Sequence, residues 1–156
     1  MLLIDALTIA KNIIKNLRIN GRKLAKHNVK IVGSIRRKEA NCNDIDILII
    51  TSIKSPQLDL LMPHQWIRKG NHLYSGYINS EHVDIFFCKR SDLAFAMMHH
   101  TGPASYNIRL RKYAKDRGWK LNQYGLWRGD KKYSVKHEKD ITAILGTTYY
   151  KPTDRN

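Results

Sequence analysis

The chain has 156 residues, 42% of them hydrophobic, which suffices for one compact domain or for two small subdomains that share a cleft. Its 28 lysines and arginines outnumber its 13 aspartates and glutamates and give a formal net charge of +15. A basic excess of this size points to a polyanionic partner, most simply nucleic acid, and is too large to be explained by solubility alone.

Composition excludes several other classes of protein. No apolar run approaches the ~20 residues of a membrane span, and no stretch joins a lysine-rich face to a strongly apolar face, so no membrane partner is expected. Charged residues interrupt the apolar positions near the N-terminus, which does not fit a signal peptide. The two cysteines, Cys42 and Cys88, make no disulfide framework and no zinc motif. We expect a soluble intracellular protein, with cytoplasm, nucleus and virion all open as its compartment.

The first ninety or so residues have the pattern of a small sheet with helices. Apolar side chains at a rough helical spacing predict a helix over residues 4–27, with a break at Asn20-Gly21. A strand at 29–33, a short helix from Ser34 and a strand at 45–51 follow. The remaining elements expected in this part are a helix that begins after Ser55 and ends at Pro63, and strands at 66–68, 73–78 and 83–87.

The rest of the chain is predicted to be mainly helical. Ser91-Asp92 caps a helix that the segment 99–103 interrupts, and Pro103 begins a second helix that runs to about Arg117. A hairpin, a last short helix and an extended tail follow, at 119–128, 138–145 and 149–156. The sequence therefore predicts an α+β fold, with one domain over residues 1–91 and a smaller α/β subdomain over residues 92–156.

One stretch carries a pattern suited to nucleotide chemistry. Gly33-Ser34 separates a short strand from a short helix, and a glycine turn of this kind directs backbone N–H groups outward, where they can bind a phosphate. Asp44 and Asp46 stand at i and i+2 at the start of an apolar strand, so both side chains point to one face of the sheet. Two carboxylates beside a phosphate-binding turn are what a Mg²⁺ site requires.

A third carboxylate belongs to the same predicted site. Asp84 lies inside the apolar run 83–87, where an unpaired charge is costly and metal ligation would explain it. The ordinary interpretation of each piece is a turn or a strand end in solvent. The order and separation of Gly33-Ser34, Asp44 and Asp46 are much more specific, because together they match the signature of the nucleotidyltransferases.

The whole pattern resembles the family X DNA polymerases, the polymerase beta group, over nearly the full length of the chain. The family pattern Gly-Ser-x-Arg-Arg, six residues, Asp-x-Asp is matched from Gly33 to Asp46, and the later Asp by Asp84. The family's Thr-Gly before a helix that carries Asn and Arg is matched by Thr101-Gly102, Asn107 and Arg111. Further matches to the C-terminal subdomain lie at 120–126, 138–141 and 150–152.

The resemblance implies a nucleotidyltransferase palm domain with a mixed sheet, and template-directed nucleotidyl transfer from a dNTP to a DNA 3′-hydroxyl, filling short gaps during repair. Its cofactor would be two Mg²⁺ ions, with Mn²⁺ as a substitute, on the catalytic residues Asp44, Asp46 and Asp84. The nucleotide-binding residues that it implies are Gly33, Ser34, Arg37, Asn43, His99, Thr101, Gly102, Tyr106 and Asn107. Those expected to bind template or other DNA are Arg111, Lys112, Lys120 and Arg128.

The chain also departs from the family pattern. The family's lyase domain and helix-hairpin-helix clamp have no counterpart here, so no lyase activity is expected and positive charge must hold the DNA. Such binding should weaken steeply with salt. The pair His99-His100 stands where polymerase beta has two aromatic residues, which makes the exclusion of ribonucleotides an open question. The expected partners are gapped or nicked double-stranded DNA and dNTPs, bound by a monomer.

Two other functions fit part of the pattern. An untemplated nucleotidyltransferase acting on RNA, a protein or a small molecule would keep the three aspartates, but would need neither +15 nor Asn107 and Arg111 on one helix. A catalytically inactive DNA-binding module would not need all three aspartates. Whether the product base follows the template base separates the first of these from a polymerase.

Overall fold

A five-stranded sheet forms the centre of the N-terminal part in the computed structural model, which describes all residues from 1 to 156. In spatial order its strands are β3 (Val29–Ile31), β4 (Ile45–Ile50), β8 (Glu81–Cys88), β7 (Leu73–Ile78) and β6 (His64–Lys69). β4 and β8 are parallel and every other neighbouring pair is antiparallel. The sheet is therefore mixed, as the sequence predicts.

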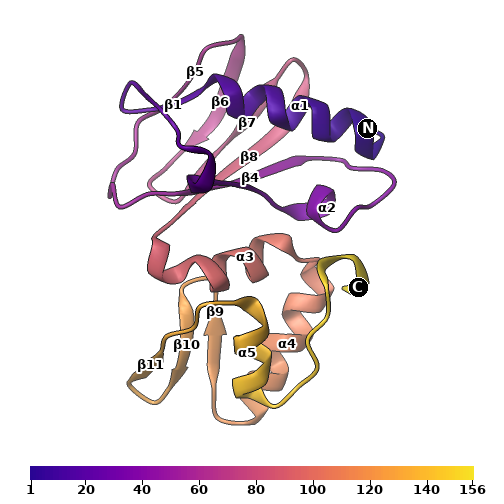
Figure 1. The fold of residues 1–156 in the computed structure, drawn as a ribbon, viewed down its shortest axis with the longest axis vertical. Helices are drawn as coiled ribbons and strands as arrows, with labels where there is room; N and C mark the ends of the chain where they lie inside the picture. The colour runs from indigo at the N-terminus through magenta and orange to yellow at the C-terminus, as the bar shows by residue number, and fades with distance from the viewer.

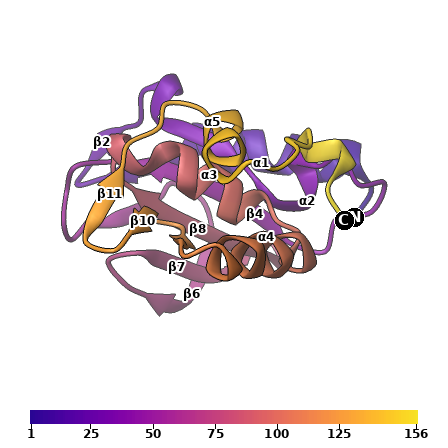
Figure 2. The same ribbon diagram turned by 90° about the horizontal axis from the view of Figure 1, so that it is seen from below.

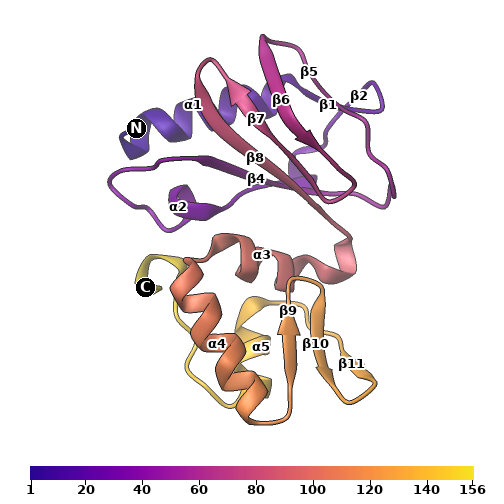
Figure 3. The same cartoon turned by 180° about the vertical axis from the view of Figure 1, so that it is seen from behind.

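Helix α1 (Leu3–Asn16) covers one face of this sheet (Figure 1). Its buried residues Ala6, Ala10 and Ile13 join a core to which β4 and β8 contribute alternate side chains. Because successive strand residues point to opposite faces, burying Val83 and Ile85 directs Asp84 to the other face, which α1 leaves open (Figure 3). The apolar alternation of β8 thus positions Asp84.

One predicted helix in this part is confirmed only in its first half, and another is wrong. The helix expected over 4–27 ends at Asn16, and the chain turns at Asn20-Gly21 to form the hairpin of β1 (Leu17–Ile19) and β2 (Arg22–Lys23). The segment expected to be helical after Ser55 is strand β5 (Leu58–Leu60). β1 and β5 pair antiparallel and bury Leu17 and Leu60 opposite one another, so a distant partner overrides the local helix signal.

The C-terminal part packs three helices and a second sheet around its own core. The helices are α3 (Leu93–Thr101), α4 (Ala104–Asp116) and α5 (Glu138–Leu145), and the sheet consists of β9 (Lys120–Asn122), β10 (Gly125–Arg128) and β11 (Lys131–Tyr133). The core includes Phe95, Leu126 and Ile141. Short 3₁₀ turns complete the chain: η1 (Lys26–Asn28), η2 (Arg90–Asp92) and η3 (Pro152–Asp154).

Three details of this part differ from the expectation. α3 continues through His99 and His100 to Thr101, because Gly102, with φ +63°, and not the histidine pair ends the helix. The predicted hairpin has a third strand, β11. The tail contains η3 instead of being wholly extended. None of the helices combines the length and apolar character that crossing a bilayer requires.

Helix α3 lies between the two parts (Figure 1), and the view from below looks along the axis on which they are stacked (Figure 2). Ala96 of α3 packs against Val32 and Leu48 in a small apolar cluster between them. A cluster of ionic groups closes the junction on the side of α2 (Gly33–Arg36), where Arg36 pairs with Glu138 at 2.6 Å. Arg155 contacts the same carboxylate at 3.1 Å and its side chain is fully buried, so residues far apart in sequence hold the parts together.

Candidate active site

The three predicted catalytic aspartates lie at the start of the central strand pair. Asp46 of β4 and Asp84 of β8 are register partners on neighbouring parallel strands, and Asp44 immediately precedes β4. Asp44 is the most open of the three, since 51% of its side chain is exposed against 24% for Asp84. Carboxylates from two strands thus share the face of the sheet that α1 leaves free.

Gly33 is fitted to the Asp46 carboxylate. Its φ is +62°, and a Cβ placed on it would lie 2.0 Å from Asp46 Oδ2. The backbone N–H of Val32 donates to the carbonyl of Asp46 at 2.9 Å and fixes the two segments side by side. Only glycine meets both requirements, because it tolerates positive φ and leaves room for the carboxylate.

The electrostatics of this cluster favour a bound cation. Burial, together with the neighbouring carboxylates of Asp84 and Asp44, raises the pKa of Asp46 to about 7, whereas Arg37 and His82 oppose the rise. In addition, the buried Oδ1 of Asp84 has no hydrogen-bond partner. Both observations describe negative charge that the protein itself does not fully compensate.

His82 occupies the space between two of the carboxylates. Its Nδ1 lies 3.1 Å from Asp44 Oδ1, and its Nε2 lies 3.7 Å from Asp84 Oδ1 and 3.1 Å from the Ser75 hydroxyl. In this arrangement no three acidic, histidine or cysteine side chains converge as ready ligands of one ion. The donor set still fits Mg²⁺, because carboxylate oxygens are its preferred protein ligands and Asp84 offers an uncommitted one.

A pocket of about 520 Å³ opens beside the aspartates, between the two parts of the molecule. It is bounded by the turn into α2, the end of α3 and the start of α4. The predicted site residues that line it are Gly33, Ser34, Arg37, Asn43, Asp44, Asp46, His99, Thr101, Gly102 and Asn107. The structure therefore brings together motifs that lie some seventy positions apart in the sequence.

Arg37 spans this pocket from one part to the other. Its guanidinium donates to the carbonyl of Thr101 and forms an ion pair with Glu39, and only 13% of the side chain is exposed. Arg36 makes the parallel connection by donating to the Thr101 hydroxyl at 2.6 Å. The adjacent arginines of the motif thus have different roles: Arg36 belongs to the junction, and Arg37 lines the pocket.

The histidine pair forms the opposite wall of the pocket. Arg111 donates to His99 Nδ1 at 2.7 Å, and Asn107 donates to the His99 carbonyl at 2.7 Å. His100 stacks on Phe86 with ring centroids 3.9 Å apart. Burial lowers the pKa of His99 to about 4, helped by Arg111, and that of His100 to about 3, so both rings are neutral at pH 7.

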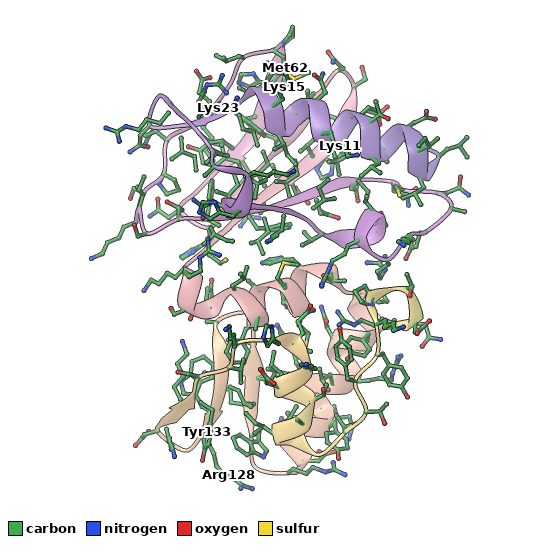
Figure 4. All side chains as sticks on the ribbon, viewed as in Figure 1. Lys11, Lys15, Lys23, Met62, Arg128 and Tyr133 are labelled. Carbon is green, nitrogen blue, oxygen red and sulfur yellow. The ribbon has the colours of Figure 1, made fainter.

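Several predicted residues lie outside this pocket. Tyr106 is buried in the C-terminal core, and its hydroxyl has no hydrogen-bond partner. Lys112 pairs with Asp116 on the surface of α4. Lys120 lies over the Trp127 ring, and Arg128 lies over the Trp119 ring at the end of the molecule farthest from α1 (Figure 4).

The structure adds residues that the sequence pattern did not single out. Glu39 and Asn41 line the pocket, and His82 contacts Asp44. His82 could have been found, because it stands two residues before Asp84 and therefore shares its face of the strand. Glu138 lies in the segment 138–141 that matches the family, but its pairing with Arg36 had no such signal, since Arg36 lies 102 residues away.

Comparisons with known proteins agree with this architecture. The family described as DNA polymerase beta thumb matches residues 96–156. Repair DNA polymerase X of African swine fever virus (isolate Tick/South Africa/Pretoriuskop Pr4/1996) is 33% identical over 169 aligned residues, which cover 93% of this chain and 95% of the viral protein.

Solved structures of Leishmania infantum polymerase beta share the fold. Its ternary P/T complex superposes with a TM-score of 0.78 at 20% identity, covering all of this chain and 76% of that one. Its ternary gap complex gives the same TM-score at 18% identity and 70% coverage of that chain. The similarity to the viral enzyme covers almost the full length of both chains, and the protein therefore belongs to the family X DNA polymerases.

Proposed function

We propose that this protein fills short gaps in DNA during repair by template-directed transfer of a nucleotide from a dNTP to a primer 3′-hydroxyl. The observation that carries the proposal is the pocket that joins Asp44 and Asp46 to Asn107 of α4. The names of the similar proteins support it, since one is a viral repair polymerase and another was solved as a gap complex. A viral source and a role in DNA repair belong to the same proposal.

Asp44, Asp46 and Asp84 would hold two Mg²⁺ ions, with Mn²⁺ as a substitute. When bound, these ions supply positive charge at the triphosphate and lower the pKa of the primer hydroxyl. Asp84 would accept the proton of that hydroxyl, and its buried Oδ1, which lacks a donor, is available for such a role. The primer oxygen then bonds to the α-phosphorus, and pyrophosphate leaves.

Arg37 would bind the triphosphate together with Ser34 and the backbone of the Gly33 turn. The guanidinium already faces the pocket, but it is paired with Glu39. A triphosphate carries more negative charge than one carboxylate and would take the place of Glu39 in that pair. Binding of the dNTP would therefore release Glu39 toward solvent, while Asn43, which also lines the pocket, would contact the nucleotide.

The sugar and base would lie against the opposite wall. Thr101-Gly102 and His99 would line the sugar, and Asn107 would contact the minor groove of the nascent pair. Contacts in the minor groove sense the shape of the pair more than its identity. Because His99 is held by Arg111, the position of the incoming sugar is tied to the side on which the templating base would lie.

DNA would be held largely by charge. Residues 1–91 would act as the catalytic palm, and residues 92–156 as the part that binds nucleotide and template. Lys112, Lys120 and Arg128, all exposed, would contribute phosphate contacts beyond the pocket, and Tyr106 would support α4 from the core. The protein would act as a soluble monomer on gapped or nicked duplexes, with an affinity that falls steeply with salt.

The test is single-nucleotide extension on a duplex with a one-nucleotide gap, in Mg²⁺, with each dNTP offered against each template base. We expect extension that follows the template, and none by Asp46→Asn. Extension that ignores the template would replace the proposal by an untemplated transferase. If the folded protein extends no DNA at all, the proposal is wrong and RNA or small-molecule acceptors become the candidates.

A further inference from the structure

A second large groove lies at the other end of the central strand pair. It measures about 510 Å³ and opens where β4 and β8 end, at Thr51 and Cys88. Its floor comes from the N-terminal part, and its rim includes Tyr124 of the β9–β10 turn in the C-terminal part. At about 3.3 Å per strand residue, Thr51 lies roughly 16 Å from Asp46, so the groove is separate from the active site.

Two aromatic side chains meet across this groove. His72 comes from the β6–β7 turn and Tyr124 from the β9–β10 turn, and their rings contact edge to face with centroids 5.9 Å apart. Both residues are exposed, and 40% of Tyr124 is open to solvent. These exposed rings are not part of the hydrophobic core. At the mouth of a polar groove they offer a stacking surface for a planar ligand.

The groove is also basic. Lys54, Lys89 and Lys132 line it, and Asp92 is its only acidic residue, which leaves a net charge of 3 − 1 = +2. Lys132 pairs with Asp92 at 2.9 Å, so Lys54 and Lys89 carry the charge that is not paired. Cys88 stays a neutral thiol, because burial raises its pKa to about 12. Aromatic faces beside free lysines are the composition of sites that bind single-stranded nucleic acid.

A direct connection links the groove to the candidate active site. Arg111, which holds His99, also donates to Gln123 Oε1 at 3.3 Å. Arg111 is the residue expected beside the templating base, and its partner Gln123 immediately precedes Tyr124. Only Gln123 therefore separates Arg111 from the aromatic pair of Tyr124 and His72. A DNA template strand that passes Arg111 and follows the β9–β10 turn would reach Tyr124 and His72 next.

We infer that this groove binds unpaired nucleotides of the template strand adjacent to the templating base. Tyr124 and His72 stack on the bases, and Lys54 and Lys89 contact the phosphates. The inference rests on the proposed function in one respect, namely that Arg111 marks the template side. It assigns a binding role to a face of the junction that carries none of the residues of the catalytic motifs.

The test compares two DNAs that share one primer–template duplex, of which one has a six-nucleotide 5′ template extension and the other is blunt. Fluorescence anisotropy, without metal or dNTP and at fixed salt, gives the affinity for each. We expect Tyr124→Ala to lower affinity for the extended DNA about 10-fold and for the blunt DNA less than about 2-fold, since stacking on one base contributes about 1–3 kcal/mol. Tyr149→Ala is the control, because Tyr149 is similarly exposed, at 38%, and lies outside the groove.

The lysines give a second, independent measurement. Removing one lysine that neutralises a phosphate of a single strand should reduce the slope of log affinity against log salt by about 0.7. We expect this for Lys54→Ala and Lys89→Ala with the extended DNA, but not for Lys11→Ala, an exposed lysine on α1 (Figure 4). An equal reduction on both DNAs, or none on either, would overturn the inference.

Gap filling by the wild type is measured separately, on the one-nucleotide gap. If the wild type extends by template and Tyr124→Ala binds extended DNA like the wild type, the groove assignment alone fails. If the wild type does not extend, the proposed function fails, and the anisotropy comparison still decides whether the groove binds a single strand.

Discussion

The two ends of the β4–β8 strand pair have opposite electrostatic character. At the start of the strands Asp44, Asp46 and Asp84 gather negative charge, and at their ends Lys54 and Lys89 gather positive charge around a groove of nearly the same volume as the catalytic pocket. The first end is costly, because burial and the neighbouring carboxylates of Asp84 and Asp44 raise the pKa of Asp46 to about 7. At the second end the lysines are exposed to water and cost little stability. A functional role is therefore easier to recognise at the first end, where the charges are costly.

The largest effect is expected from removing charge at the acidic end. Asp46→Asn should lower turnover by at least about 10³-fold, because it removes a metal ligand whose contribution to the transition state is several kcal/mol. Affinity for gapped DNA, measured by anisotropy, should stay near that of the wild type, since a carboxylate supplies no attraction to the phosphates of DNA. Residual turnover within about 10-fold of the wild type would rule out the assignment of Asp46 as a metal ligand.

Moving the same carboxylate without removing it should have the next largest effect. Gly33→Ala places a methyl group where Asp46 Oδ2 lies, so we expect activity to fall about 100-fold, with a decrease of about 1–3 kcal/mol in unfolding free energy from strain. Gly21→Ala is a matched control, because Gly21 also has positive φ, +78°, but has no atom near its Cβ position. The Gly21→Ala variant should be destabilised to a similar extent but keep its activity. An equal fall in activity in both variants would show that the contact with Asp46 is unimportant.

A smaller effect is expected at Arg37, which lies beside the acidic end but has opposite charge. Arg37→Ala should raise the dNTP Michaelis constant about 10-fold and change kcat less, since charged hydrogen bonds contribute about 1.5–3 kcal/mol. Glu39→Gln should lower the same constant, because Glu39 competes with the triphosphate for Arg37. Steady-state kinetics on gapped DNA measures both, and an unchanged constant in Arg37→Ala would remove Arg37 from the phosphate site.

The last expected effect concerns the stability of the fold, not its activity, and depends on pH. The pKa of Asp46 is about 7 in the fold and 3.8 as its ordinary value, so the folded protein without metal holds a proton that the unfolded chain has already released. Its stability should therefore fall as pH rises from about 4 to about 7, by about 3 kcal/mol or roughly 10 °C in Tm.

Thermal melts of wild type and Asp46→Asn at pH 5 and pH 7.5 isolate the contribution of this group, and the difference between the two proteins should shrink at pH 5. Mg²⁺ binds the ionised carboxylate, so it should raise Tm at pH 7.5 more than at pH 5. A Mg²⁺ effect of the same size at both values would contradict this coupling.

How far the sequence predicts the molecule depends on the range of the interactions concerned. Strands β4, β7 and β8 follow from apolar patterning, and Gly33, Asp44 and Asp46 follow from spacing, because neighbours along the chain determine them. β1 and β5 were missed because each is a strand only by pairing with the other across some forty residues. The contact of Arg36 with Glu138, and the groove between two turns, depend on how the parts meet, which no local pattern encodes.

The ionic cluster of Arg36, Glu138 and Arg155 has a consequence for how related sequences diverge. Glu138 serves both arginines, and Arg155 is fully buried, so replacing the glutamate alone leaves a buried positive charge without its partner. A substitution at one of these positions alone should therefore destabilise the fold, whereas replacing all three together should not. Among related sequences, positions 36, 138 and 155 should be kept together or exchanged together, and this covariation would report the contact between the two parts without any further structure.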